Sequence, residues 1–234
     1  MTVRNSDRFV TSYNRIDQLM KDIIGTKEHM AFLRLIDFAK KKNAVIRKYE
    51  GDLREYGDLR NAIVHRRTST EFAIAEPHED VVLKMEEMEI ALTKPITVGN
   101  MFRTKVTTFQ RTDFFSYALK VIKDKKYNQF PVYDGTEFKG LITPVGITMW
   151  MASMVDSETF SRKKTTLGEI LAHENNRENH QFIGKGASIY EALEIFKEAI
   201  TRGKRLEALL ITEDGKPNKI LIGIITPMSM MKVK

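Results

Sequence analysis

The sequence contains no cysteine, which excludes disulfide bonds, thiolate metal ligands and cysteine nucleophiles. It also lacks any apolar run near the roughly 20 residues that a membrane-spanning helix needs. The N-terminal stretch MTVRNSDRFV has no hydrophobic signal core. Only 6 of the 234 residues are proline and 13 are glycine, whereas 42% are hydrophobic, as in a globular chain. We therefore expect a cytoplasmic protein with a buried core and no membrane partner.

The charge is positive but not concentrated in one segment. The formal net charge is +7, and short basic clusters such as 40–42, 66–67 and 162–164 lie far apart in the chain. Such clusters are most often solvated surfaces or charges near helix C-termini. Four of the histidines, at positions 29, 78, 173 and 180, have no metal-ligand spacing with each other. The sequence therefore predicts no metal site and no required cofactor.

An internal repeat organises the C-terminal part of the chain. The segment GLITP at 140–144 recurs as GIITP at 223–227, which is 83 residues further on. Upstream of each copy, apolar residues recur with helical spacing; they are Phe115, Ala118, Leu119 and Ile122 in the first and Ile189, Ala192, Leu193 and Phe196 in the second. The two copies differ in spacing mainly in polar stretches, as expected of insertions in loops.

The repeated segments GLITP and GIITP are called the GhhTP motif, in which h is an apolar residue. Each copy also carries a short apolar strand and a glycine turn between the helix and this motif. These are FPVY at 130–133 with Asp134-Gly135, and ALLI at 208–211 with Asp214-Gly215. Each copy therefore reads strand, helix, strand, turn, strand, helix. A three-stranded sheet covered by helices on one face must bury the other face, so the copies should pack against each other. The expected fold class is α/β, a pseudo-symmetric pair of repeats preceded by an all-α domain.

The two copies resemble CBS domains, whose tandem pair is called a Bateman module. The matching segments are 108–118, 130–135 and 140–143 in the first copy, and 182–192 and 223–226 in the second. The resemblance covers 94–234, with repeats at 94–160 and 161–234. It implies two clefts that take AMP, ATP, S-adenosylmethionine or a cyclic dinucleotide, so the expected partner is a small nucleotide that acts as a regulatory ligand.

The resemblance also implies which residues contact the ligand. Apolar walls would be Val106, Thr108, Phe109, Phe130 and Pro131 in one site, and Phe182, Ile183, Ala208 and Leu209 in the other. Thr143 and Thr226 would supply hydroxyl groups. The simpler interpretation is that both threonines are helix N-caps, with proline at the next position. The two interpretations are compatible.

One position departs from the family pattern. Many nucleotide-binding CBS motifs place an aspartate three residues after the threonine, where it binds both ribose hydroxyls. This sequence has Gly146 and Ser229 there. Either the ligand is bound mainly through its base and phosphate, or the pair of repeats is a structural dimer without a ligand.

Residues 1–75 are expected to form a helical domain, followed by an acidic helical connector at 76–93. Apolar stripes support two of its helices; they are Phe9, Tyr13, Ile16 and Met20, and Phe32, Leu35, Ile36 and Ala39. The string YGDLRNAIVH at 56–65 resembles the motif of HEPN proteins, whose active members cleave RNA across a dimer without metal. In that comparison His65 would transfer the proton, Arg60 would stabilise phosphorane charge and Asn61 would orient the phosphate. The alternative is a non-catalytic helical dimer.

The leading interpretation is a ligand-sensing regulatory protein whose CBS pair binds an adenine-containing nucleotide and controls the helical domain or the oligomeric state. An endoribonuclease gated by that ligand, acting through Arg60, Asn61 and His65, is the competing function, with RNA as its partner. A structural dimer with empty clefts is the third. In each case we expect a homodimer, because isologous two-fold pairing is the commonest way to bury further apolar surface.

Overall fold

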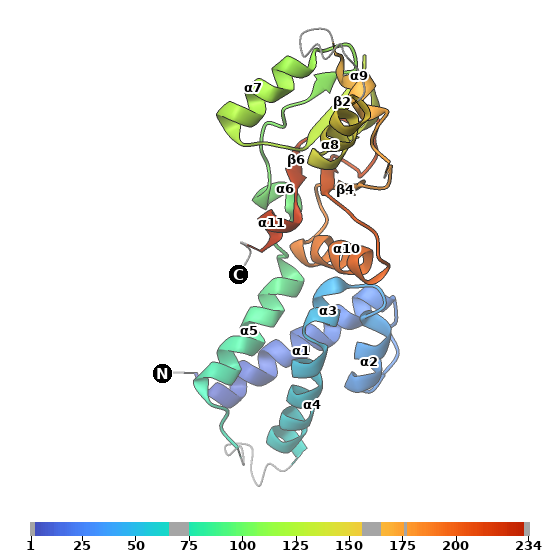
Figure 1. The fold of residues 1–234 in the computed structure, drawn as a ribbon. Helices are drawn as coiled ribbons and strands as arrows, with labels where there is room; N and C mark the ends of the chain where they lie inside the picture. Colours follow the sequence, from blue (N-terminus) through green and yellow to red (C-terminus); the bar gives the residue numbers. More distant parts are fainter. Residues whose placement is uncertain (1–2, 66–74, 156–164, 176, 232–234) are drawn as a thin grey trace. The chain divides into compact units, whose positions relative to one another are not determined.

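The computed structural model describes residues 3–65, 75–155, 165–175 and 177–231, without the side chain of His65. The chain divides into two compact units, residues 1–96 and 97–234 (Figure 1). The first unit is helical, and the second contains two three-stranded sheets with their helices. The units are described separately below.

The described residues of the N-terminal unit form five helices. Their bounds are α1 Asn5–Ile24, α2 Phe32–Ala39, α3 Ala44–Lys48, α4 Glu50–His65 and α5 Glu79–Thr93. The apolar stripe expected on the first helix is buried: Phe9, Ile16 and Met20 are fully inaccessible and Tyr13 nearly so. Gly25 ends α1 with a φ of 76°, a left-handed conformation that glycine adopts without steric cost.

Helix α5 covers most of the segment that the sequence analysis treats as a connector, and it packs along α1 (Figure 1). Val82, Met85 and Met88 form its buried face. On the outer side, the Arg8 guanidinium binds both carboxylate oxygens of Glu86, at 2.9 and 2.8 Å. Three of the acidic residues of 76–93, Glu79, Glu86 and Glu89, therefore form ion pairs with arginines of the first helix.

The C-terminal unit contains the two expected repeats. After α6 (Val98–Met101), the first comprises β1 Phe109–Gln110, α7 Phe115–Lys125, β2 Phe130–Asp134, β3 Glu137–Ile142 and α8 Pro144–Ser153. After α9 (Leu167–Leu171), the second comprises β4 His180–Gly184, α10 Ile189–Thr201, β5 Ala208–Thr212, β6 Gly223–Ile225 and α11 Pro227–Met230. In each sheet the first strand is parallel to the second, and the second is antiparallel to the third. The expected fold class is confirmed.

Strand β5 is buried on both of its faces. Leu209 and Ile211 point into the core beneath α10, together with Ala192 and Phe196. Ala208 and Leu210 point the other way and contact Leu141 of β3, in a cluster that joins the two repeats. A strand buried on both faces reads as a continuous apolar run, and ALLI at 208–211 is one.

The segment before each repeat packs on the other repeat. Val98 of α6 lies in the core of the second repeat, and the Val98 amide donates to the Ala187 carbonyl at 2.8 Å. Leu167 and Ile170 of α9, which precede the second repeat, lie in the core of the first. The repeats are therefore interlocked through their leading segments.

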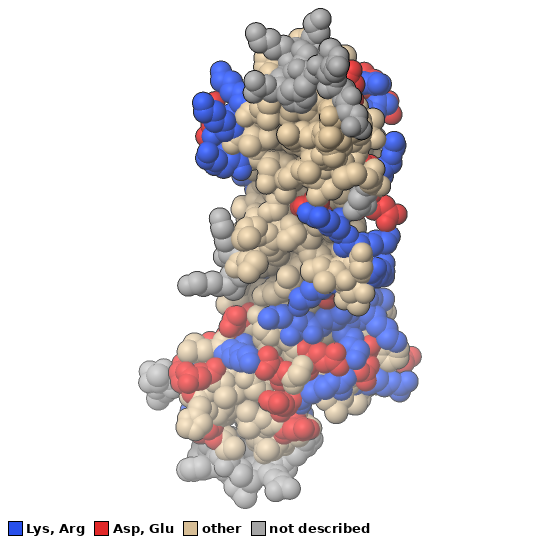
Figure 2. Space-filling model, viewed as in Figure 1, with Lys and Arg blue, Asp and Glu red and all other residues tan. Residues whose placement is uncertain are grey.

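Charges of both signs are mixed on the surface. On the face drawn in Figure 2, Lys and Arg side chains lie beside Asp and Glu over the helical unit. The ion pairs of the helical unit include Lys84 with Asp52 at 2.6 Å and Arg15 with Glu89 at 2.9 Å. In the described part of the chain, no helix is both long and apolar enough to cross a bilayer.

Candidate functional site

One cavity of the C-terminal unit lies at the end of the second GhhTP motif. It has a volume of about 420 Å³ and receives residues from both repeats. Its lining is Thr104–Thr107, Lys126–Gln129, Ile224, Thr226, Met228 and Ser229. We call it the Thr226 cleft. Small-molecule sites commonly occupy 300–1,000 Å³ and combine apolar walls with a few polar groups, as this cleft does.

The polar groups of the Thr226 cleft are organised by the start of α11. The Thr226 side chain accepts a hydrogen bond from the Ser229 amide at 3.2 Å, and the Ser229 hydroxyl accepts one from the Thr226 amide at 2.7 Å. The N-cap interpretation of Thr226 is therefore confirmed, with Pro227 at the first helical position. Lys105 and Lys126 line the same cleft, and the Tyr127 ring is 49% exposed. Together they offer hydroxyls, two cations and an aromatic surface.

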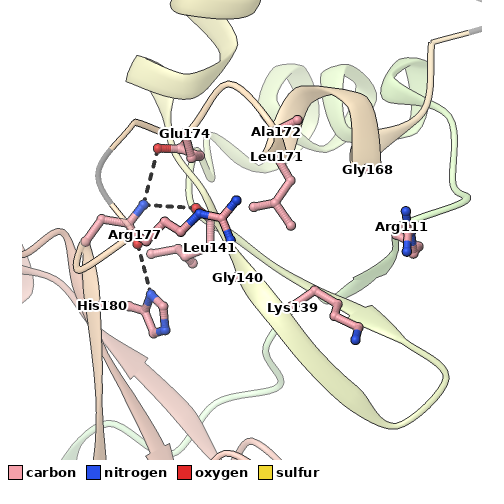
Figure 3. A pocket seen from close by; sticks show the side chains of 11 residues that line it. Arg111, Lys139, Gly140, Leu141, Gly168, Leu171, Ala172, Glu174, Arg177 and His180 are labelled. Carbon is pink, nitrogen blue, oxygen red and sulfur yellow. Dashed lines mark hydrogen bonds between the residues drawn. The ribbon is translucent and has the colours of Figure 1, made fainter.

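A second cavity, of about 370 Å³, lies among β3, α9 and the start of β4. It is lined by Arg111, Lys139–Leu141, Gly168, Leu171, Ala172, Glu174, Arg177, Asn179 and His180 (Figure 3). We call it the Glu174 pocket. Glu174 is the one acidic side chain among these described lining residues, whereas Arg111, Lys139 and Arg177 are basic.

Glu174 is buried, with 7% of its surface exposed. Its Oε1 accepts from the Thr143 amide at 2.5 Å, and its Oε2 accepts from Asn179 Nδ2 at 3.3 Å. Beside this carboxylate, the Gly146 amide donates to the Thr143 hydroxyl at 3.5 Å. Burial raises the pKa of Glu174 above its ordinary value, and the hydrogen bonds to the carboxylate only partly oppose the rise.

Asn179 joins this carboxylate to the rest of the pocket. Its Nδ2 also donates to the Leu141 carbonyl at 3.0 Å, and its Oδ1 lies 2.9 Å from His180 Nδ1 (Figure 3). The His180 ring meets Phe138 edge-on, with 4.9 Å between ring centroids. Burial lowers the pKa of His180.

The residues expected to contact a ligand fall into three groups. Val106 and Thr226 line the Thr226 cleft. Thr143 is buried, caps α8 as expected, and bonds to Glu174. The remaining expected wall residues line neither cavity: Thr108 is exposed, Phe109 and Phe182 are half-buried, and the rest are buried. The buried ones are Phe130, Pro131, Ile183, Ala208 and Leu209.

Sequence reasoning did not find several residues that line the cavities. The polar run 126–129 and Lys105 carry no family signature, although they flank an expected strand and the expected wall residue Val106. Glu174 lies in the irregular stretch between the two repeats, where neither periodicity nor the repeat gives a position. Its role depends on a contact with Thr143, 31 residues earlier in the sequence.

In the helical unit, Arg60 and Asn61 line a cavity of about 620 Å³ together with Tyr13 and Phe32. The Arg60 guanidinium lies 5.3 Å from the centroid of the Tyr13 ring, and Arg60 Nη1 donates to Asn61 Oδ1 at 3.4 Å. The side chain of His65 lies outside the described residues. The catalytic assignment of Arg60, Asn61 and His65, and the HEPN resemblance itself, stay predictions.

Comparison with known proteins gives structural matches alone. Neither a protein-family model nor a curated protein matches the sequence. The structure of CBSX2 in complex with AMP is 16% identical, with a TM-score of 0.41 over 58% of this chain and 94% of that one. The CBS domains of a transcriptional regulator from Streptococcus pneumoniae are 19% identical, with a TM-score of 0.39 over 58% and 98%.

A conserved CBS-domain protein from Thermoplasma acidophilum is 11% identical, with a TM-score of 0.44 over 60% of this chain and 70% of that one. Because these TM-scores are below 0.5, the description of the fold rests on the repeated strand order within this chain. Among the described residues, no group of three or more His, Asp or Glu side chains is arranged to hold a metal ion.

Proposed function

We propose that the C-terminal unit is a regulatory module that binds one adenine-containing nucleotide in the Thr226 cleft. The observation that carries the proposal is the cleft itself, about 420 Å³ in volume, with hydroxyl, cationic and aromatic groups on its walls. The ligand class comes from the resemblance of the repeats to CBS domains. A purine fits a site of flat apolar walls with a few polar groups, and two lysines suit its phosphates.

The proposed binding mode follows from the lining residues. The base packs against Val106, Ile224 and the Tyr127 ring. The ribose contacts the hydroxyls of Thr226 and Ser229, which are able both to donate and to accept. The phosphates are bound by Lys105 and Lys126. Because Ser229 replaces the carboxylate that many CBS motifs place there, the phosphate contacts contribute more than in those motifs.

Calorimetric titration with AMP, ATP, S-adenosylmethionine and a cyclic dinucleotide tests the proposal. A ligand at 100 times its dissociation constant should stabilise the folded protein by about 2.7 kcal/mol. Thr226→Val should weaken binding about two- to tenfold, since each lost hydrogen bond contributes roughly 0.5–1.5 kcal/mol. It should also lower stability by about 1 kcal/mol, because Thr226 caps α11.

Two control variants separate binding from folding. Thr226→Ser keeps the hydroxyl and should retain the affinity. Thr148→Val removes an exposed hydroxyl of α8 that donates a hydrogen bond to the Pro144 carbonyl at 2.8 Å. This variant should leave nucleotide binding unchanged. Absence of binding for every one of these nucleotides at millimolar concentration would rule out the proposed function.

A further inference from the structure

The two repeats differ at the residue three positions after the threonine of the GhhTP motif. In the second repeat this residue is Ser229, and its hydroxyl bonds back to the Thr226 amide within the motif. In the first repeat it is Gly146, which has no side chain with which to do the same.

The space beside Gly146 is filled by Glu174. A Cβ atom added to Gly146 would lie 2.2 Å from Glu174 Oε1 and 2.4 Å from its Cδ. Real Cβ atoms do not approach other atoms so closely, so glycine is required for the carboxylate to reach this position. In the other repeat the counterpart of Gly146, Ser229, lines the open Thr226 cleft.

The Glu174 carboxylate also accepts hydrogen bonds on both of its oxygens. The donors are the Thr143 amide, at 2.5 Å, and Asn179 Nδ2, at 3.3 Å. Thr143 is the N-cap of α8, a ten-residue helix, so the carboxylate lies at the start of that helix. The Thr143 amide that a bound anion would need is therefore already taken.

We propose that the Glu174 side chain is an internal occupant of the first cleft, the one beside Thr143 and Gly146 of the first repeat. Its carboxylate takes the place of a ligand's anionic group. Removing its side chain creates a site for a small oxyanion, such as formate, acetate or phosphate. The site is bordered by Arg177, His180 and Lys139, which line the same pocket. If Glu174 occupies this cleft, wild-type protein binds a single nucleotide per chain, a consequence that rests on the proposed function. The occupancy of the cleft by Glu174 does not rest on it.

Chemical rescue of Glu174→Ala in the full-length chain tests the inference. We measure the melting temperature in sodium formate and in sodium chloride at equal ionic strength. Formate should raise the melting temperature of Glu174→Ala by several degrees, with saturation. Wild-type protein should show no difference between the salts.

Two further variants are matched controls. Glu174→Gln keeps the volume but not the charge, so it leaves no room for formate and should show no rescue. Glu169→Ala removes an exposed carboxylate that also accepts from a backbone amide, that of Thr166 at 2.9 Å. Because that carboxylate is exposed, solvent is able to replace it in the variant, so no saturable response is expected.

The outcomes decide the inference in each case. If Glu174→Ala unfolds in chloride, recovery of its circular dichroism in formate supports the inference, and failure to recover overturns it. Equal responses of Glu174→Ala and wild type, or of Glu174→Ala and Glu174→Gln, also overturn it. Formate rescue combined with no binding of AMP, ATP, S-adenosylmethionine or the cyclic dinucleotide by wild-type protein would refute the proposed function alone. Two AMP sites in wild-type protein would refute the internal-occupant inference alone.

Discussion

His180 lies half-buried between aromatic rings, with its Nδ1 2.9 Å from Asn179 Oδ1. Because burial lowers its pKa, the folded protein holds the imidazole neutral at pH values where the unfolded chain begins to protonate it. The unfolded value is about 6.5. The free energy of unfolding therefore decreases as the pH falls below that value, until the folded pKa is reached.

We predict that His180→Phe reduces this loss of stability on acidification. Phenylalanine keeps the ring packing on Phe138 and cannot be protonated. Urea unfolding at pH 7.5 and pH 5.5 gives the change for each protein, so a constant cost of losing the bond to Asn179 cancels. If the two proteins lose equal stability between these pH values, His180 does not contribute to the pH dependence.

Individual residues were predictable where their role is local. Thr143 and Thr226 are N-caps because threonine followed by proline favours a helix start wherever it occurs. Glu174 was not predictable, since its environment is created by tertiary contacts with a turn far away in the sequence. The missing aspartate at Gly146 was visible in the sequence, but its meaning depends on what fills the space.

At the scale of elements, the glycine that opens each GhhTP motif lies where a segment leading into a repeat crosses a strand. A Cβ on Gly223 would lie 2.2 Å from the backbone oxygen of Phe102, which follows α6. A Cβ on Gly140 would lie 2.9 Å from a methyl group of Leu171 in α9. The repeated glycines therefore allow the leading segments to interlock.

We expect Gly223→Ala to destabilise the protein by about 1–3 kcal/mol, the usual cost of overpacking. The colliding atom is a backbone oxygen, which side-chain rotation cannot move away. Chemical denaturation measures the loss. Gly186→Ala, where no atom lies within 4 Å of the added carbon, is the matched control and should change stability little. Equal stability of the two variants would show that the strand adjusts to the extra methyl group.

Long elements followed from apolar periodicity, and short ones did not. Helices α1, α7 and α10 each carry a buried stripe at helical spacing, which made them predictable. Helices α6 and α9 have four and five residues, too few to show a period. The two-residue strand β1 exists because it pairs with β2, not because of its own sequence.

At the scale of the whole molecule, apolar side chains remain exposed on the C-terminal unit. Met149 and Met151 of α8 are 42% and 52% exposed, and Met228 of α11 is 67% exposed. Burying such side chains against a second copy would remove apolar surface from water.

We predict a homodimer, with a mass in light scattering of twice 27.0 kDa. Met149→Lys combined with Met151→Lys should shift the protein toward monomer, because a buried interface strongly disfavours unpaired charge. The ratio of dimer to monomer should change when AMP is added if the nucleotide controls assembly. A wild-type mass of 27.0 kDa at every concentration would contradict the prediction.

The interlocked leading segments also determine when the C-terminal unit is able to fold during synthesis. Val98 shares its core with residues as late in the chain as Ile225 and Met230. At about 5–20 residues per second, the ribosome adds those partners roughly 6 to 25 s after Val98. Until then the second repeat lacks β6 and α11, whereas α9, which contributes Leu167 and Ile170 to the core of the first repeat, has already been synthesised. The first repeat is therefore able to form its core before the second, and Val98 remains without its last core partners until β6 and α11 have been added.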